Sequence, residues 1–502
     1  MLFNTLEYIL FLPIVVLVYY LMPKKLRYIW LLGVSYYFYM QWNQLYILLL
    51  FLCTLITYIG GLVLEKLKNS EKDADGKNKW EKRVCFILCM VANLGILAFF
   101  KYASFGISLF NRALACIGAS PVSWEPDILL PVGISFYTLQ ALGYLVDVYR
   151  GDIYAERNFI RYALFVSFFP QLVAGPIERS KSLLVQLHKY HPFDYEKFRK
   201  GLMLILYGLF LKMVIADRAA IIVDRVYGDS LAYSGIYVVV ATFFFAIQIY
   251  CDFYGYSMIA RGSALLMGIT LMDNFQAPYF SKSVREFWRR WHISLSGWFR
   301  DYLYIPLGGS RKGNVHKEAN RLFVFAVSGL WHGASLGFVA WGLLNGIYQV
   351  MEDLVNQFRQ KLHSVAGGRV QTAMRFSKKL FQTMLTFVLV TAAWLFFRSG
   401  GLSESLEMIR NLFGSQNLTV LFDGSLYGLG VDRNNMYVLF VSILVLFVVD
   451  YYKYQGKDVA DIFLWQGWWF RTAVIMMLVF TILLYGCYGE MYDTQQFIYF
   501  QF

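Results

Sequence analysis

Long apolar runs recur through this chain and limit the folds open to it. Residues 45–64 are a clear example because they carry no charged side chain. A helix needs about 20 such residues to cross the roughly 30 Å hydrocarbon core of a bilayer. Apolar residues form 58% of the 502-residue chain and charged residues 16%, whereas soluble proteins average about 45–50% and about 25%. Lipid rather than water must cover such a surface, so we expect a polytopic membrane protein.

The membrane-spanning segments are expected to be helical, because an open sheet edge finds no hydrogen-bond partners in lipid. The candidate crossings lie near 6–22, 28–40, 45–64, 84–103, 128–148, 201–216, 235–251, 380–397, 436–450 and 471–486. The sequence therefore predicts an all-α membrane fold with about 10–12 transmembrane helices. We expect one integral-membrane domain over residues 1–502.

The distribution of charge predicts an orientation. Residues 65–83 carry seven Lys and Arg, whereas 104–127, expected to form an external loop, carry only Arg112. The positive-inside rule then places 65–83 and 282–317 in the cytoplasm and the N-terminus outside. The net charge of +13 comes from loops between apolar spans, so it favours contact with anionic lipid headgroups over binding of nucleic acid.

Two apolar stretches do not suit a simple crossing. Residues 159–175 precede a basic segment, and residues 321–350 lie between two basic segments. If the basic loops stay inside, both stretches must enter and return, or lie broken within the protein. The Gly and Pro residues of FFPQLVAGP (168–176) and SGLWHGASLG (328–337) suit that structure, which is tolerated only where protein or a wet cavity surrounds it.

The sequence gives no sign of a metal site or a bound cofactor. The six cysteines include no CxxC pair and no Cys/His cluster, and thiols beside apolar runs behave as small hydrophobes. No nucleophile elbow, P-loop or HExxH motif is present. A covalent serine mechanism therefore has no local support.

His332 is the histidine that most suggests function, because it lies midway through the apolar stretch 321–350. It could be a structural residue whose ring only bonds neighbouring carbonyl groups. It could also be a general base, since imidazole, with a pKa near 6.5, can take a proton from a hydroxyl near neutral pH. The other histidines, His188, His191, His316 and His363, lie in polar or basic segments and are expected to be ordinary surface residues.

His292 lies in an unusual aromatic and basic block, residues 282–301. Trp288, Trp291, Leu295, Trp298 and Tyr302 recur at the spacing of one helix face. One interpretation is an interfacial helix that contacts lipid headgroups. The alternative is a cytoplasmic vestibule for a phosphate-bearing substrate, since Arg binds phosphate in a bidentate manner. The candidate substrate-binding residues are then Arg285, Arg289, Arg290, Trp291, Arg300 and Trp331.

Five further charged residues lie near predicted span ends, where they could snorkel or pair, so we expect them to be structural. They are Lys101, Asp147, Lys212, Asp217 and Asp252.

Several segments together resemble the membrane-bound O-acyltransferase superfamily, in the bacterial branch that contains the alginate O-acetyltransferase membrane subunit and the D-alanyl transfer protein of teichoic acid modification. The matching segments are LPVGISFYTLQALGYLVDVYRG (130–151), FFPQLVAGPIER (168–179), GLFLKMVIADR (208–218), IYCDFYGYS (249–257), DNFQAPYF (273–280), EFWRRWHISLSGWFRDYLYIPLGGSRKG (286–313), SGLWHGAS (328–335) and FIYFQF (497–502). They cover most of 130–345, the expected catalytic core. Met258 stands where related proteins often carry an acidic residue, so that position receives no catalytic role.

The resemblance implies a funnel-shaped helical core with a central tunnel in a bacterial cytoplasmic membrane. It implies that His332 is the catalytic histidine and His292 the second active-site histidine. The implied donor is acetyl-CoA, which is a substrate and not a bound cofactor, and the implied acceptor is a surface polysaccharide, reached through an extracytoplasmic SGNH-hydrolase-like partner. D-alanyl transfer from a carrier protein to teichoic acid is the alternative within the family. A non-catalytic scaffold or a transporter is the alternative outside it.

Overall fold

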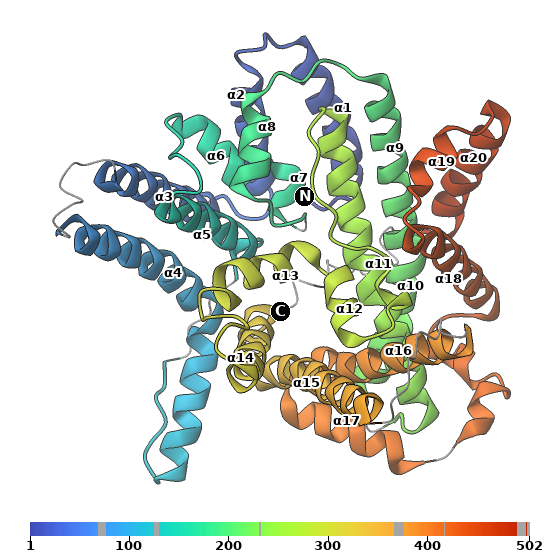
Figure 1. Cartoon of the computed structure of the whole chain (residues 1–502). Coiled ribbons are helices and arrows are strands. Elements are labelled where there is room, and N and C mark those ends of the chain that lie inside the picture. The colour runs from blue at the N-terminus through green and yellow to red at the C-terminus, as the bar shows by residue number, and fades with distance from the viewer. Residues whose placement is uncertain are drawn as a thin grey trace. The chain divides into compact units, whose positions relative to one another are not determined.

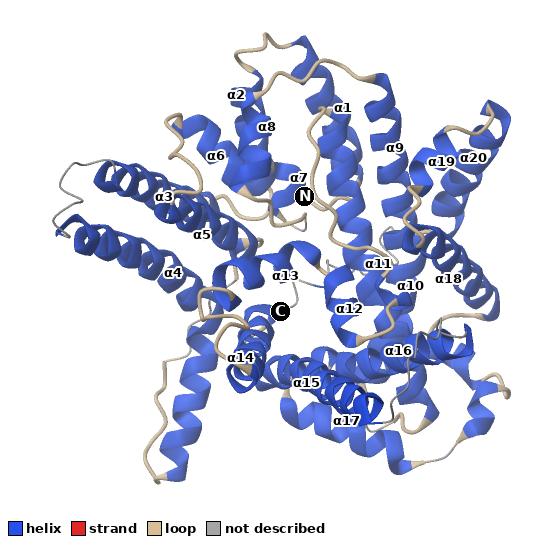
Figure 2. Cartoon of the chain, viewed as in Figure 1, coloured by secondary structure: helices blue, strands red, loops and turns tan. Residues whose placement is uncertain are grey.

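The computed structural model of the chain describes residues 1–68, 77–124, 130–173, 175–229, 232–365, 376–415, 417–488 and 498. Every regular element in these ranges is a helix (Figure 2), which confirms the predicted all-α class. The chain forms two compact units, one of Met1–Ile205 with Tyr256–Met272 and one of Leu206–Gly255 with Asp273–Phe502.

The first unit contains three long helices that run alongside one another, α3, α4 and α5 (Figure 1). Small residues on α3 make this close packing possible: a Cβ atom on Gly61 would lie 2.9 Å from the Tyr144 ring, and one on Gly60 would lie 2.6 Å from the Cys89 sulfur. The helices of this part of the chain are α1 (Leu6–Leu21), α2 (Arg27–Met40), α3 (Tyr46–Lys68), α4 (Lys77–Cys116), α5 (Ile134–Arg150), α6 (Phe159–Ser167), α7 (Phe169–Leu172), a π-helical turn (Ser180–Leu184), α8 (Val185–His188) and α9 (Tyr195–Leu209).

Helix α4 is longer than the sequence predicted. Residues 104–116, expected to belong to a loop, continue the helix, and this stretch contains no proline that would interrupt it. The helix ends where Gly118 adopts a φ of 70° and the N–H of Ala119 donates to the carbonyl of Leu114 at 2.9 Å. This is the left-handed termination that glycine favours at helix C-termini.

The apolar stretch 159–175 is broken, as the sequence predicted. Helix α6 has nine residues and therefore rises only about 14 Å, too short to cross a bilayer. At the break, the N–H of Phe169 donates to the hydroxyl of Ser35 at 3.1 Å. The side chains of Gln140 and Gln171 both donate to the carbonyl of Phe165, at 2.6 and 2.9 Å. Buried side chains thus satisfy the backbone groups that the break releases.

The second unit is built around α11 and a helical hairpin of α14 and α15. Its helices are the π-helix Phe210–Ala216, α10 (Asp217–Gly228), α11 (Ile236–Leu266), whose last residues belong to the first unit, the 3₁₀ turn Pro278–Phe280, α12 (Val284–Arg290), α13 (Ile293–Phe299), the π-helical turn Arg300–Tyr304, α14 (Asn314–His332), α15 (Leu336–Val365), α16 (Phe376–Arg398), α17 (Leu402–Gly414), the 3₁₀ turns Leu418–Leu421 and Ser425–Leu429, α18 (Arg433–Tyr454), α19 (Val459–Leu464) and α20 (Trp468–Tyr485).

The α14–α15 hairpin is the second broken stretch, and the break lies at residues 333–335. The two helices run antiparallel and approach closely at glycines. A Cβ atom on Gly329 would lie 2.2 Å from the carbonyl oxygen of Phe338, and one on Gly342 would lie 2.2 Å from that of Phe325. This close packing requires small residues, and it fixes the position of the C-terminal end of α14.

Six helices in the described ranges are long and apolar enough to cross a membrane, so the protein is a multi-pass membrane protein. They are Tyr46–Lys68, Lys79–Cys116, Ile236–Leu266, Phe376–Arg398, Arg433–Tyr454 and Trp468–Tyr485. Helix α1 is apolar but shorter. The total number of crossings, the orientation and the single-domain boundaries 1–502 remain predictions.

Candidate active site

His292 lies at a sharp turn between two short helices, α12 and α13. Its backbone adopts the left-handed conformation, with φ 44° and ψ 53°, directly before α13. That conformation is uncommon for a residue with a Cβ atom and costs about 1–3 kcal/mol, so the surroundings must stabilise it. Asn274 does so: its carbonyl accepts from the N–H of Ile293 at 3.0 Å, and its side chain accepts from the N–H of Ser294 at 3.4 Å.

The prediction that residues 288–302 form one face of a single helix is therefore wrong. Helix α12 ends at Arg290, Trp291 is extended, and α13 starts at Ile293. The physical reason is the turn at His292, which changes the direction of the chain. The first N–H groups of α13 then donate hydrogen bonds to Asn274.

His332 is the last residue of α14 and is followed by the break at Gly333. The structure brings the two predicted histidines together: their ring centroids lie 6.3 Å apart. Both are buried, with His292 0% and His332 3% exposed. His292 lies outside the six candidate spans, and burial lowers its pKa to about 3, so its ring is neutral at physiological pH.

Aromatic rings surround the histidine pair. The ring of His332 lies 5.1 Å from Trp341 and 5.4 Å from Phe397, both edge-on. The ring of His292 lies 4.6 Å from Phe253. Trp331, a predicted substrate-binding residue, stands 6.2 Å from His292 and 4.8 Å from His332. The walls of the site are thus apolar, and hydrogen bonds formed inside them are stronger than in water.

Trp291, the other predicted tryptophan, packs among further aromatic rings. It stacks on Phe287 at 5.3 Å, contacts Trp394 at 5.1 Å and is 1% exposed. Its contacts support the shell behind the histidines. Trp341 and Trp394 were not singled out from the sequence, because an aromatic residue in an apolar helix carries no signal that separates a site from a core.

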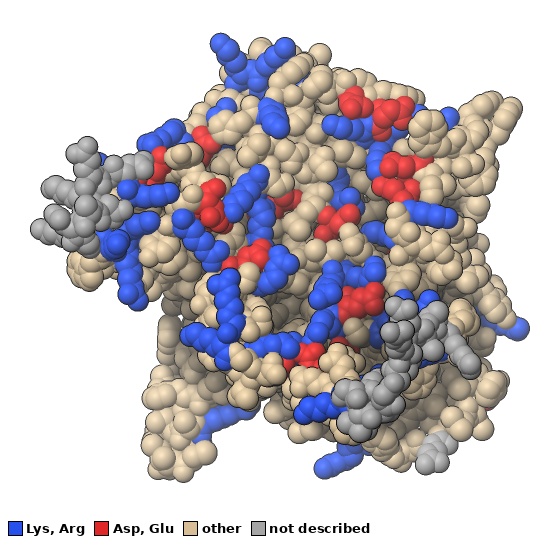
Figure 3. Space-filling view, viewed as in Figure 1, with Lys and Arg blue, Asp and Glu red and all other residues tan. Residues whose placement is uncertain are grey.

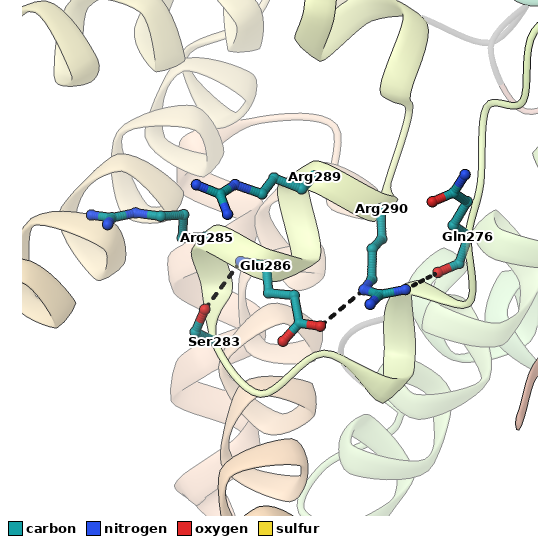
Figure 4. Close-up of a pocket in the computed structure, with 6 residues that line it drawn as sticks. All are labelled: Gln276, Ser283, Arg285, Glu286, Arg289 and Arg290. Carbon is teal, nitrogen blue, oxygen red and sulfur yellow. Dashed lines mark hydrogen bonds and ion pairs between the residues drawn. The ribbon is translucent and has the colours of Figure 1, made fainter. Parts of the chain in front are cut away.

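Next to the histidine segment, α12 presents a polar pocket of about 480 Å³, which is lined by Gln276, Ser283, Arg285, Glu286, Arg289 and Arg290. Lys and Arg side chains gather over α12, with carboxylates among them (Figure 3). Figure 4 shows that Arg285 and Arg289 extend in the same direction, whereas the guanidinium of Arg290 lies between Glu286 and Gln276.

The four predicted arginines differ in their partners. Arg290 pairs with Glu286 at 3.0 Å and donates to the carbonyl of Gln276 at 3.1 Å. Arg285 pairs with Asp353 on α15. Arg300 pairs with Asp301 at 2.8 Å and does not line the pocket.

Arg289 is the exception. It is exposed, and the structure shows no ion pair or hydrogen bond from its side chain within the described ranges. It is therefore the arginine of this pocket that is best able to bind a new anion.

Two carboxylates on α15, Glu352 and Asp353, join α12 to the hairpin and were missed in the sequence. The carboxylate of Glu352 accepts from the N–H groups of Val284 at 2.5 Å and Arg285 at 3.3 Å, at the N-terminus of α12. In addition to Arg285, Asp353 accepts from Lys317 at 2.7 Å and from Arg321 at 3.0 Å. We call Glu352 and Asp353 the α15 clamp. It ties the segment before His292 to the hairpin that carries His332.

Four of the five remaining charged candidates have polar partners, as the sequence suggested. Lys212 lies 2.7 Å from Asp217 and 2.6 Å from Asp252, and all three side chains are almost completely buried. The N–H of Ile498 donates to Asp252 at 2.7 Å; the other residues of the matching terminal segment 497–502 lie outside the described residues. Asp147 accepts from Ser180 at 2.6 Å.

The loop histidines whose side chains the structure describes have polar partners. His188 lies 2.5 Å from the carboxylate of Glu156, whereas His191 and His316 contact backbone carbonyls. The side chain of His363 is outside the described residues. In the part of the chain that the structure describes, no group of three or more His, Cys, Asp or Glu side chains could hold a metal ion.

The sequence is similar to known proteins over the region that contains the two histidines. A family model described as the membrane-bound O-acyltransferase family matches residues 156–394, which include both histidines. A probable alginate O-acetylase of Pseudomonas syringae pv. tomato is 37% identical over 89% of this chain and 82% of the relative. A peptidoglycan O-acetyltransferase of Helicobacter pylori is 32% identical over 84% and 81%. A teichoic acid D-alanyltransferase of Streptococcus thermophilus is 28% identical over 56% and 71%.

Proposed function

Because this chain belongs to the membrane-bound O-acyltransferase family and is an O-acyltransferase, we propose that it transfers an acetyl group from a cytoplasmic thioester for O-acylation of an extracytoplasmic polysaccharide. The acetyl group is favoured by the similarity to two relatives named as O-acetylating proteins, at 37% and 32% identity. The relative named as a D-alanyltransferase matches a smaller share of the chain, 56%. D-alanyl transfer to teichoic acid is therefore the second candidate.

The observation that carries the proposal is the buried pair of His292 and His332, whose ring centroids are 6.3 Å apart. At this separation the two imidazoles can act on different atoms of one reacting acyl group. His332 takes the proton of the acceptor hydroxyl while the hydroxyl oxygen attacks the thioester carbonyl carbon. The carbon–sulfur bond then breaks, and the proton passes from His332 to the leaving thiolate.

His292 acts on the oxygen of the same carbonyl. As a neutral imidazole it can donate an N–H hydrogen bond to the oxyanion that forms during attack, a role in which one donor typically contributes about 10²–10³-fold to the rate. The aromatic rings of Phe253 and Trp331 beside the pair limit access of water, which would otherwise hydrolyse the thioester.

The α12 pocket is the proposed site for the phosphates of acetyl-CoA. Arg289 is the strongest candidate for direct binding, with Arg285 beside it (Figure 4), because guanidinium groups bind phosphate in a bidentate manner. Arg285, Arg290 and Arg300 already have carboxylate partners, so we give them a supporting role. Arg289 lies only three residues before His292 in the chain, so a donor held there can reach the histidine pair through its flexible thioester arm.

We further propose that the protein resides in the bacterial cytoplasmic membrane with its N-terminus outside, as the loop charges suggest. An extracytoplasmic SGNH-hydrolase-like protein then completes transfer to the polysaccharide. The described chain consists mostly of membrane helices and connecting segments, which leaves few residues to form a binding site for a long polymer.

The decisive experiment measures acetyl transfer by purified protein in liposomes supplied with radiolabelled acetyl-CoA and an acceptor, comparing wild type with His332→Ala. We expect a loss of about 10²–10⁴-fold, the usual contribution of a general base. His316→Ala is the matched control, because this partly exposed histidine contacts a backbone carbonyl among the described contacts, and it should keep wild-type activity.

A His332→Ala protein of normal abundance that keeps more than about a tenth of wild-type activity lies outside that range and would favour a scaffold. Transfer from a D-alanyl carrier protein, with none from acetyl-CoA, would favour the second candidate.

A further inference from the structure

A second basic pocket lies in the first unit, where α1 ends and α2 begins, against the segment after α8. Its volume is about 390 Å³, and its lining includes five cationic side chains and no carboxylate. They are Lys24, Lys25, Arg27, Arg161 and Lys189. None of these residues belongs to the histidine site or the α12 pocket, so this pocket is not explained by the acyl transfer proposed above.

One of the five cations is buried: Arg27 lines the pocket but is only 9% exposed. It donates to the carbonyls of His191 at 2.8 Å and Tyr20 at 3.3 Å and lies over the ring of Tyr190 at 5.0 Å. These partners fix its direction, but carbonyls and rings carry no formal charge. A positive charge held away from water without a counter-ion is unfavourable, and an anion in the pocket would remove that cost.

Among the other cations of the lining, Arg161 is paired with a carboxylate, whereas the described contacts show no such pair for the three lysines. Glu156 is the carboxylate bonded to this region, and it contacts His188 at 2.5 Å and Arg161 at 3.9 Å. Lys24 lies over the ring of Tyr190 at 4.1 Å. Within the described ranges, Lys24, Lys25 and Lys189 form no ion pair, so the pocket keeps a concentrated positive charge.

The pocket also has an apolar part, which points to the kind of anion that it takes. Leu31, Leu187 and Ile269 belong to its lining. Leu21 and Leu26, which flank the two lysines in the sequence, are 75% and 43% exposed. An inorganic ion would use the cations and leave these surfaces without a partner, whereas a lipid would use both.

We propose that this pocket binds the phosphate group of an anionic phospholipid, with the cations around the phosphate and the acyl chains along the exposed leucines beside it. Basic pockets next to membrane helices are suited to such headgroups. The bound lipid would hold the α1–α2 connection against the segment that carries His191.

The test uses the full-length protein in nanodiscs of phosphatidylcholine with or without phosphatidylglycerol, and native mass spectrometry counts the lipids retained. The variant replaces Lys24, Lys25 and Lys189 together with Gln. A basic residue near an anionic membrane surface contributes about fivefold to binding, so the triple variant should retain phosphatidylglycerol about a hundredfold more weakly. The control Lys378→Gln/Lys379→Gln/Lys457→Gln removes three lysines elsewhere, and Lys457 likewise lies over a tyrosine ring.

Preferential retention of phosphatidylglycerol by wild type and by the control, lost in the triple variant, supports the proposal. Displacement of the lipid by millimolar inorganic phosphate would identify the site as a phosphate site without lipid preference and overturn the lipid assignment. Equal retention by all three proteins would overturn the site itself. If the triple variant does not fold, Lys189→Gln alone should still weaken retention about fivefold, and an unchanged value would overturn the proposal.

Discussion

The α15 clamp gives the sharpest prediction about how the active site is held together. Asp353→Asn keeps the shape of the side chain but removes the charge that Arg285, Lys317 and Arg321 share. The side chain of Asp353 is 9% exposed, so water cannot fully replace the lost charge. The expected result is a less stable protein in which α12 is held less firmly against the hairpin.

The expected loss of stability in Asp353→Asn can be estimated from the cations that contact Asp353. A hydrogen bond to a charged group contributes about 1.5–3 kcal/mol, which would suggest a large loss for three such bonds. However, the side chains of Arg285 and Lys317 are 35% and 22% exposed, and Lys317 and Arg321 keep Glu318 at 3.1 and 2.6 Å. Asn also retains one acceptor oxygen. We therefore expect a loss of about 1–3 kcal/mol in the free energy of unfolding.

The same change should lower acyl transfer, because α12 leads directly into the strained turn at His292. A misplacement of about 1 Å can reduce a rate by about 10²-fold, and we expect a tenfold to hundredfold lower kcat at saturating donor. Asp353→Glu, which restores the charge, should recover part of the activity. A purely structural role would lower the amount of folded protein without lowering kcat per folded molecule.

The pH dependence has a defined sign. Burial alone would raise the pKa of Asp353, but hydrogen bonds from Lys317, Arg285 and Arg321 outweigh it and hold the pKa well below its usual range. A carboxyl group whose pKa is lowered by folding contributes stability that is complete above its unfolded pKa, about 3.9, and is lost as the pH falls below it. The difference between wild type and Asp353→Asn should therefore be constant from about pH 5 to 8 and shrink only in stronger acid.

The assay is thermal unfolding in detergent, together with steady-state kinetics on the folded fraction. The control is Asp423→Asn, an exposed carboxylate that bonds the side chain and backbone of nearby Ser425, and it should change neither value. Unchanged stability and unchanged kcat in Asp353→Asn would refute the clamp.

Three further predictions concern the donor, the topology and the partner. Arg289→Ala should raise the KM for acetyl-CoA about tenfold or more with a smaller effect on kcat, because a charge-assisted contact to phosphate contributes about 1.5–3 kcal/mol. Arg300→Ala should have little effect, and steady-state kinetics with varied donor concentration checks both variants. An unchanged KM for Arg289→Ala would exclude Arg289 from donor binding. Cysteines introduced at Lys79 and Lys312 should react with a membrane-impermeant maleimide only after the cells are opened, because both belong to the predicted cytoplasmic segments, and labelling of either in intact cells would reverse the orientation. Acylation of the polysaccharide should require a second, extracytoplasmic protein, so polymer acylation by this chain alone, purified and given donor, would contradict that prediction.

The sequence predicted the helical membrane class and both broken stretches, because these follow from properties that a linear pattern contains. Apolar runs set the class, and glycine and proline marked the breaks at Phe168 and Gly333. The sequence did not predict that α4 continues through 104–116. Polar and apolar residues alternate there without a strong stop signal, so the loop and the helix were not distinguishable before the termination at Gly118.

The site was predictable only in part, for a different reason. His332 stood out because a titratable ring in an apolar run is costly, and His292 drew attention through its aromatic and basic neighbours. The turn at His292 depends on Asn274, and Asp353 of the α15 clamp pairs with cations on two other helices. Such contacts arise from packing between segments, which no single stretch of sequence displays. The catalytic roles of the two histidines remain predictions.

The surroundings of the two histidines favour different chemical roles for the two rings. Burial beside Phe253 and Trp331 lowers the pKa of His292, which makes it a poor proton acceptor near neutral pH. A neutral imidazole of this kind suits a carbonyl oxygen that gains negative charge during attack. In the mechanism that we propose, the general base is then His332. It ends α14 at the break before Gly333, where the backbone leaves the helix. We therefore propose that His292 acts on the carbonyl oxygen of the donor and that His332 acts on the acceptor hydroxyl.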